Sequence, residues 1–352
     1  MSTSVSSPAA VVPPETEPTS VPVEVAAVLP GEHWDEAPDD YDDDLAVNDV
    51  QSSTASITSS ILNYRTFKGR TYHSDRGTAQ YWGSNDGRHS DSLDMFYHAT
   101  SLLLDEKLHL APVENPKKVL DIGTGTGIWA IDFADAHPET IVIGTDVSPI
   151  QPTWVPPNLI FEIEDCTQPW TFTPGSFDFV HMQFLVGSIP DWYALFREAY
   201  TALEPGGYLE SFESSPLTHS DDGSMPANSA NAQWGPIFFQ GGDKIGRTAR
   251  VIEDDIQVKA MEAAGFVDIQ VTNFKCPSGI WPKDKRQREI GELIMYSVLN
   301  DVEGWILFMS NTLGWTLEQI MVYTAHLRRE FKKGEYHCYI RQRVVYGRKP
   351  KV

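Results

Sequence analysis

Three glycines and two acids in the middle of the chain have the types and spacing of a nucleotide-binding turn. The pattern Asp-x-Gly-x-Gly-x-Gly runs from Asp121 to Gly127, directly after a short apolar stretch rich in β-branched residues. Glycines let a backbone turn tightly and approach a ligand closely, and the first amides of the next helix can face that ligand. Asp146 follows 23 residues after Gly123, an offset at which an acid of a doubly wound fold hydrogen-bonds ribose hydroxyls. These residues therefore predict a site for a ligand that carries a ribose.

Two alternatives apply to this turn. The dinucleotide fingerprint is Gly-x-Gly-x-x-Gly, but here the third glycine comes one position early and Ile128 stands where a glycine belongs. This difference disfavours an oxidoreductase that uses a nicotinamide dinucleotide. Asp146 could instead cap a helix, since Ser148 and Pro149 after it also suit a turn.

The end of a later predicted strand, 176–183, carries His181, Met182 and Gln183, followed by Phe184. Strand ends in open α/β sheets face the ligand crevice, so we expect these side chains near the ligand. His181 is a candidate general base, because an imidazole titrates near neutral pH. A hydrogen-bonded structural histidine is the alternative.

Strand and helix patterns alternate around these residues. Apolar stretches predict strands at 119–122, 141–143, 158–163, 176–183, 208–213, 266–271 and roughly 336–346. Helical spacing separates most of them, which predicts an α/β fold with a doubly wound, mostly parallel seven-stranded sheet. A core domain is expected over 116–352, with insertions at 215–250 and 275–333. The first insertion reads as irregular, and 284–333 reads as helical.

The segments before this core differ in composition. Residues 1–60 are rich in Ser, Thr, Pro, Val and acids, and no Lys or Arg occurs before Arg65. We expect a disordered acidic tail there. Residues 61–115 are expected to form a helical cap, with one helix from Ser90 to Leu110. Ser90, Asp91 and Ser92 are its candidate N-caps.

Charge and cysteine content exclude several classes of protein. The net charge is −22, which argues against a large nucleic-acid interface. Cys166, Cys276 and Cys338 are far apart in sequence, so we expect neither a zinc site nor a disulfide framework. The N-terminus has no secretory signal pattern, and no apolar run reaches membrane-spanning length. The expected location is cytoplasmic or nuclear.

Four longer stretches carry a family resemblance: 119–138, 143–166, 177–192 and 203–213. Together they resemble class I S-adenosylmethionine (SAM) methyltransferases, which have a Rossmann-like fold. The runs 148–154 and 187–192 are narrower and resemble the fungal LaeA-like group. That group includes regulators of secondary metabolism and methyltransferases encoded in biosynthetic clusters.

The resemblance implies SAM as cofactor and a last strand that pairs antiparallel. It also implies that Asp165 accepts a hydrogen bond from the adenine amino group, a surface acid being the alternative. The implied cofactor-binding residues are Asp121, Gly123, Thr124, Gly125, Gly127, Asp146, Val147, Asp165 and Cys166. The implied chemistry is methyl transfer, in which alignment of donor and acceptor supplies much of the rate.

Two functions follow from the resemblance. In the first, the chain methylates O or N of a small fungal secondary metabolite, enclosed by the cap segments and by aromatic side chains such as Trp234, Phe238, Phe239 and Trp281. In the second, the chain is a LaeA-like regulator with little turnover that acts through a protein partner, for which the resemblance implies a protein of the velvet type. Neither function requires direct contact with nucleic acid or a membrane. Tyr72 and His73 either reach the cofactor or pack at a domain edge.

Overall fold

The structure is a computed structural model that describes residues 26–34, 36, 64–74 and 79–351. Its centre is a seven-stranded sheet in the order β5-β4-β3-β6-β7-β9-β8. The strands are β3 (Lys118–Ile122), β4 (Ile141–Asp146), β5 (Leu159–Ile163), β6 (Phe177–Gln183), β7 (Leu203–His219), β8 (Val267–Ser278) and β9 (Cys338–Arg348). The predicted mostly parallel seven-stranded sheet is confirmed.

Strand direction follows the predicted pattern. β3 to β7 pair in parallel, and β9 pairs antiparallel with both β7 and β8. In the register, Asp121 lies beside Gly144 on β4 and beside His181 on β6. Because parallel strands end at the same edge of a sheet, the loops after β3, β4, β5 and β6 meet there.

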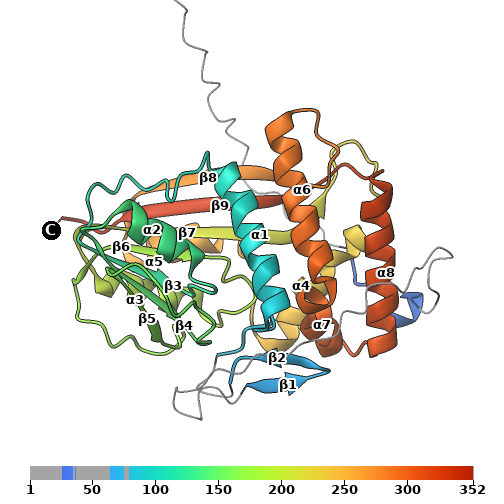
Figure 1. Ribbon diagram of the computed structural model, residues 1–352, viewed down its shortest axis with the longest axis horizontal. Coiled ribbons are helices and arrows are strands. Elements are labelled where there is room, and N and C mark those ends of the chain that lie inside the picture. Colours follow the sequence, from blue (N-terminus) through green and yellow to red (C-terminus); the bar gives the residue numbers. More distant parts are fainter. Residues whose placement is uncertain (1–25, 35, 37–63, 75–78, 352) are drawn as a thin grey trace, which may run out of the picture.

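Helices cover both faces of the sheet (Figure 1). One face carries α2 (Ile128–Ala136), near α1 (Gly87–Leu103). The other face carries α3 (Trp192–Ala202) and α5 (Ile256–Ala264). Neighbouring residues of β3 therefore enter different cores, Val119 under α2 and Leu120 under α3. A strand buried on both faces reads as a continuous apolar run, which explains its signal in the sequence.

A helical region adjoins the sheet where β7, β8 and β9 extend beyond the parallel strands (Figure 1). It contains α4 (Ala230–Ile245), α6 (Lys285–Asn300), α7 (Val302–Thr312) and α8 (Leu317–Lys333). Helices α4, α7 and α8 share a second hydrophobic core. The helical pattern predicted for 284–333 agrees with α6, α7 and α8.

The prediction that the segment after the fifth strand is irregular was wrong. β7 continues to His219, and α4 follows with Pro236 inside it. Glycines and a proline interrupt the sequence of this helix, so the apolar spacing in the sequence did not indicate it. Gly235 is needed there because a Cβ would lie 2.7 Å from the Leu217 backbone.

The boundaries predicted for the first long helix were also wrong. Helix α1 begins at Gly87 after the N-cap Asp86, whose side chain accepts from His89 N at 3.1 Å. It ends at Leu103 rather than Leu110. Before it, β1 (Arg65–Phe67) and β2 (Arg70–Tyr72) form a hairpin.

Part of the predicted tail is folded. Most of residues 1–60 lie outside the described residues, but Gly31–Trp34 forms a 3-10 helix against α8. Trp34 is 2% exposed and packs edge-to-face on Tyr323, with ring centroids 5.0 Å apart. The bounds predicted for the disordered tail, 1–60, therefore include a folded segment. Within the described ranges, no helix is long and apolar enough to cross a bilayer.

Candidate active site

A pocket opens at the carboxyl ends of β3, β4, β5 and β6. It encloses about 1090 Å³ of empty space, its open mouth included, which is in the range of ligand pockets. Seven of the nine predicted cofactor residues line it: Gly123, Thr124, Gly125, Asp146, Val147, Asp165 and Cys166. The structure thus brings most of the predicted set together, although contact with a cofactor stays a prediction.

The turn after β3 has a backbone that favours glycine. Gly123 and Gly125 have φ of 67° and 57°, which a residue with a Cβ rarely adopts. A Cβ at Gly123 would lie 2.4 Å from Leu185 Cδ2, whereas a Cβ at Gly125 would meet nothing within 4 Å. Gly125 therefore borders open space in the pocket. Gln151, from the 148–154 run, donates to Gly125 O at 2.6 Å and holds the turn.

Asp146 places a carboxylate on the pocket wall. It accepts from Gly125 N and from Ser148 N, both at 2.9 Å. Burial raises the pKa of Asp146 to about 6, although these amides act in the opposite direction. A carboxylate has about four lone-pair positions, so Asp146 can still accept from the hydroxyls of a ribose.

Asp165 and Cys166 follow β5 on the same wall. Asp165 accepts from Thr167 Oγ1 at 2.6 Å and from Ala79 N at 3.1 Å. Burial raises the pKa of the Cys166 thiol to about 12. The thiol stays protonated and presents a small apolar surface to the pocket.

Asp121 and Gly127 lie beneath the turn and not on the pocket wall. Asp121 is 1% exposed. It accepts from Thr124 Oγ1 at 2.6 Å and from His181 Nδ1 at 2.8 Å. Gly127 is the left-handed residue before α2, and a Cβ there would lie 2.4 Å from the Phe161 ring. These two residues shape the turn from below.

The candidacy of His181 as a general base needs correction. Its side chain is 2% exposed and its ring stacks on Trp129 at a centroid distance of 3.7 Å. It lines neither of the two large pockets of the described chain. His181 therefore positions Asp121. Of its neighbours, Gln183 and Phe184 do line the pocket, and Met182 is fully buried.

A segment that the sequence analysis did not single out crosses the pocket. Residues 79–85 precede α1 and contribute Ala79, Gln80, Tyr81, Ser84 and Asn85 to its lining. Asn85 is 7% exposed, and its Oδ1 has no partner among the described residues. Trp82 Nε1 donates to Val186 O at 2.8 Å, which ties the segment to the loop after β6. No local pattern in 79–85 indicates this role.

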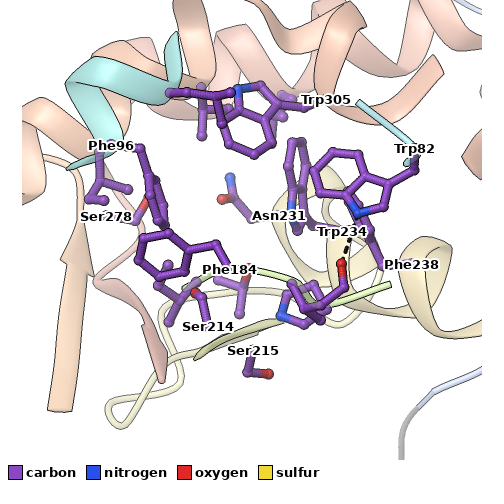
Figure 2. A pocket seen from close by; sticks show the side chains of 18 of the residues that line it. Trp82, Phe96, Phe184, Ser214, Ser215, Asn231, Trp234, Phe238, Ser278 and Trp305 are labelled. Atoms are coloured by element: carbon purple, nitrogen blue, oxygen red, sulfur yellow. Dashed lines mark hydrogen bonds between the residues drawn. The ribbon is translucent and has the colours of Figure 1, made fainter. Parts of the chain in front are cut away.

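A second, aromatic cavity adjoins the first, and Figure 2 shows the side chains that line it. It encloses about 900 Å³ of empty space, including its opening. Four residues line both pockets: Tyr81, Leu93, Phe96 and Phe184. The loop after β6 is held at this shared wall by Glu213, a fully buried carboxyl that accepts from Leu185 N and Val186 N at 3.0 and 3.1 Å.

The aromatic residues suggested by the sequence divide into two sets. Trp234 and Phe238 line the aromatic cavity, together with Trp82 and Trp305 (Figure 2). Phe239, Trp281, Tyr72 and His73 line neither large pocket. Tyr72 instead packs beside Phe67 and Phe308, in agreement with the packing alternative.

The first pocket fits SAM by its own chemistry. The Asp146 carboxylate and the unpartnered Asn85 Oδ1 supply acceptors for hydroxyl or amino groups. The open side of Gly125 leaves room for the ligand beside the turn. Among the described residues, no group of His, Cys, Asp and Glu could hold a metal ion.

Comparison with known proteins agrees with this geometry. Residues 95–271 match a family described as a methyltransferase domain. The chain is 37% identical over 314 residues to "Methyltransferase pytC" of Aspergillus terreus, covering 88% of this chain and 96% of that protein. It is 31% identical to "Secondary metabolism regulator LAE1" of Cochliobolus heterostrophus, covering 80% and 94%. It is also 31% identical to "Probable methyltransferase tdiE" of Emericella nidulans, covering 74% and 82%.

The family match includes β3 to β7 and with them the predicted cofactor residues from Asp121 to Cys166. The mostly parallel sheet, the turn after β3 and the acid at the end of β4 are those expected for this family. The chain belongs to the SAM-dependent methyltransferases, and its relatives include a fungal methyltransferase and a fungal regulator of secondary metabolism.

Proposed function

We propose that this chain transfers a methyl group from SAM to an O or N atom of an apolar small molecule in fungal secondary metabolism. One observation supports this proposal above the others: the cofactor pocket and the aromatic cavity share the wall formed by Tyr81, Leu93, Phe96 and Phe184. A donor in the first pocket and an acceptor in the second would meet at that wall.

The bound cofactor supplies a methyl group activated by a positive sulfur. Transfer would break an S–C bond of the cofactor, form an O–C or N–C bond, leave S-adenosylhomocysteine and release the acceptor's proton to bulk solvent. The side chains of the two pockets hold donor and acceptor in line and exclude water, which supplies much of the rate.

The described side chains that line the aromatic cavity include no basic or acidic group. Tyr81 at the shared wall cannot act as a base near neutral pH, because burial raises its pKa well above 10. The proposal therefore favours an acceptor that reacts without a protein base, such as a neutral amine or a phenol that loses its proton to solvent.

The alternative is a regulator that binds SAM with little turnover and acts through a protein partner, of velvet type or another. It is favoured by relatives named "Secondary metabolism regulator", which are 31–32% identical over 80% of this chain. Under either function we expect the protein in the cytoplasm or nucleus.

The test begins with calorimetric titration of SAM, S-adenosylhomocysteine and NADH. We expect micromolar binding of the first two, no binding of NADH, and loss of binding in Gly125→Arg, whose side chain would enter the pocket. A screen of phenols and anilines with radiolabelled SAM then follows. Methyl transfer to at least one aromatic acceptor supports the enzyme; cofactor binding without turnover on any acceptor favours the regulator. A folded protein that binds no SAM would refute both.

A further inference from the structure

The lining of the aromatic cavity restricts which acceptors it can hold. None of its described side chains is charged. A charged acceptor would lose its hydration there without gaining an opposite charge, which is costly. Several large rings surround the space (Figure 2), and rings of this kind pack well on other flat rings.

Two of these rings present only carbon to the cavity. Trp82 Nε1 donates to Val186 O at 2.8 Å, and Trp305 Nε1 donates to Ser297 O at 3.2 Å. Their N–H groups are therefore engaged by backbone carbonyls and are not offered to a ligand. The same holds for Ser215, whose hydroxyl donates to Glu253 Oε1 at 2.6 Å.

Asn231 differs from these three residues, because it is a polar side chain held in a fixed orientation with one polar atom left without a partner among the described residues. It lies in the first turn of α4 and is 5% exposed. Glu330 of α8 accepts from Ala230 N, Asn231 N and Asn231 Nδ2 at 2.7, 2.9 and 2.8 Å. Because a carboxylate can only accept, the amide nitrogen must face Glu330. The amide oxygen must then point elsewhere.

The amide oxygen of Asn231 is left for a ligand. No described residue donates a hydrogen bond to it, and it is not among the fully buried unpartnered atoms. Figure 2 shows the side chain in the space between Trp305, Trp234 and Phe184. Asn231 lines the aromatic cavity but not the cofactor pocket. Asn231 is therefore not part of the wall where methyl transfer is proposed.

We propose that the methyl acceptor is an uncharged, flat, largely aromatic molecule with an N–H or O–H group remote from the atom that is methylated, and that Asn231 Oδ1 accepts a hydrogen bond from this group. Glu330 is a positioning residue, since it fixes the orientation of the amide. This inference rests on the proposed function, because it takes the aromatic cavity as the acceptor site.

The experiment uses three naphthalenes that differ only in their substituents. Calorimetry on the full chain saturated with S-adenosylhomocysteine measures the affinity of 2,6-dihydroxynaphthalene, 2,6-dimethoxynaphthalene and naphthalene-2,6-disulfonate. We expect the dihydroxy compound to bind at least tenfold more tightly than the dimethoxy compound, because only the former can satisfy the amide oxygen. We expect no measurable binding of the disulfonate.

Asn231→Leu then tests the residue itself. This substitution keeps a similar volume and removes the acceptor. We expect the dihydroxy compound to lose at least tenfold in affinity and the dimethoxy compound to change less than twofold. Asn273→Leu is the matched control, the same change on the exposed side of β8, and should leave both affinities unchanged. S-adenosylhomocysteine affinity verifies that each variant is folded, and the wild-type comparison stands if Asn231→Leu does not fold.

The outcomes separate this inference from the function on which it rests. Equal wild-type affinities for the dihydroxy and dimethoxy compounds, an unchanged ratio in Asn231→Leu, or preferred binding of the disulfonate would overturn the inference alone. If no naphthalene binds to protein saturated with S-adenosylhomocysteine, the cavity is not an acceptor site and both proposals fail. Methylation of the dihydroxy compound with the expected dependence on Asn231 supports both.

Discussion

At the scale of single residues, the cofactor pocket depends on the Asp146 carboxylate, whose charged form is disfavoured by burial. Asp146 lies on the pocket wall, where burial raises its pKa to about 6. Two backbone amides stabilise its charged form without fully offsetting the loss of water. Ligand binding that needs the charged form is therefore linked to pH within an accessible range.

The first prediction concerns this linkage. Asp146 binds a proton as the pH falls below about 6, and the protonated group is a weaker acceptor for ribose hydroxyls. We expect the Kd of S-adenosylhomocysteine to be constant above pH 7 and to rise below pH 6 by up to about tenfold per unit. Calorimetry from pH 5 to 8 measures it. Asp146→Asn should bind weakly with little pH dependence; an identical pH profile in that variant would assign the effect to another group.

At the scale of elements, a buried ion network joins the N-terminal hairpin to two helices. Arg70 of β2 pairs with Asp86, the N-cap of α1, and with Asp301, the N-cap of α7. The Asp301 side chain is fully buried, and its hydrogen bonds and ion pair with Arg70 and His89 keep its pKa low, at about 2, against the effect of burial. This network fixes the start of α1, and with it Leu93 and Phe96 at the shared wall.

The second prediction removes one partner of this network. Arg70→Met leaves a buried carboxylate without its main partner, so we expect a loss of about 3–5 kcal/mol in the free energy of unfolding. Arg88 also approaches Asp301, at 3.6 Å, but its side chain is 42% exposed. Arg88→Met should therefore cost less than about 1 kcal/mol. Urea unfolding of both variants measures these losses. Similar losses in the free energy of unfolding would show that burial of the ion pair does not determine its contribution to stability.

The third prediction concerns the N-terminal segment around Trp34. This side chain is 2% exposed beside Trp315 and Tyr323 in the second core. Trp34→Ala should lower the free energy of unfolding by about 3–5 kcal/mol, because it leaves a large cavity. The control is Trp154→Ala, since Trp154 is 87% exposed and its loss should cost about 0.5 kcal/mol or less. A neutral effect at Trp34 would mean that the segment contributes nothing to stability.

At the scale of the whole molecule, the site lies where two structural regions meet. The parallel strands and their loops contribute to the cofactor pocket, and helices α4, α7 and α8 contribute Asn231, Trp234, Phe238, Trp305, Leu327 and Phe331 to the aromatic cavity. Phe184 lines both the cofactor pocket and the aromatic cavity. It follows β6 with φ of 54°, a strained backbone of the kind that proteins retain at functional sites.

The fourth prediction tests this shared wall. Phe184→Ala removes apolar contact from both pockets, so both S-adenosylhomocysteine and 2,6-dihydroxynaphthalene should lose affinity by about tenfold or more. Phe331 lines only the aromatic cavity of these two pockets. Phe331→Ala should weaken the naphthalene alone. Titration of each ligand separately measures this. If Phe184→Ala affects one ligand only, the two pockets do not share that wall.

Local sequence patterns predict most of the fold and the glycine turn of the cofactor pocket. The strands around β3, β4 and β6 were found within a few residues, because buried parallel strands read as continuous apolar runs. The turn from Asp121 to Gly127 and Asp146 were found because a tight turn needs glycine and a ribose site needs an acceptor at a set offset. Where glycine and proline interrupted the pattern, as in α4, the prediction failed.

The sequence alone therefore predicts the sheet and seven of the residues that line the cofactor pocket. Only the tertiary structure decided that His181 is buried against Trp129, that residues 79–85 cross the pocket, and that Trp34 packs on α8. The same holds for the fixed amide of Asn231, whose partner Glu330 is 99 residues away. Local spacing reports periodicity and turn chemistry. Contacts between distant segments depend on how the elements pack, and a single sequence has no local signal for them.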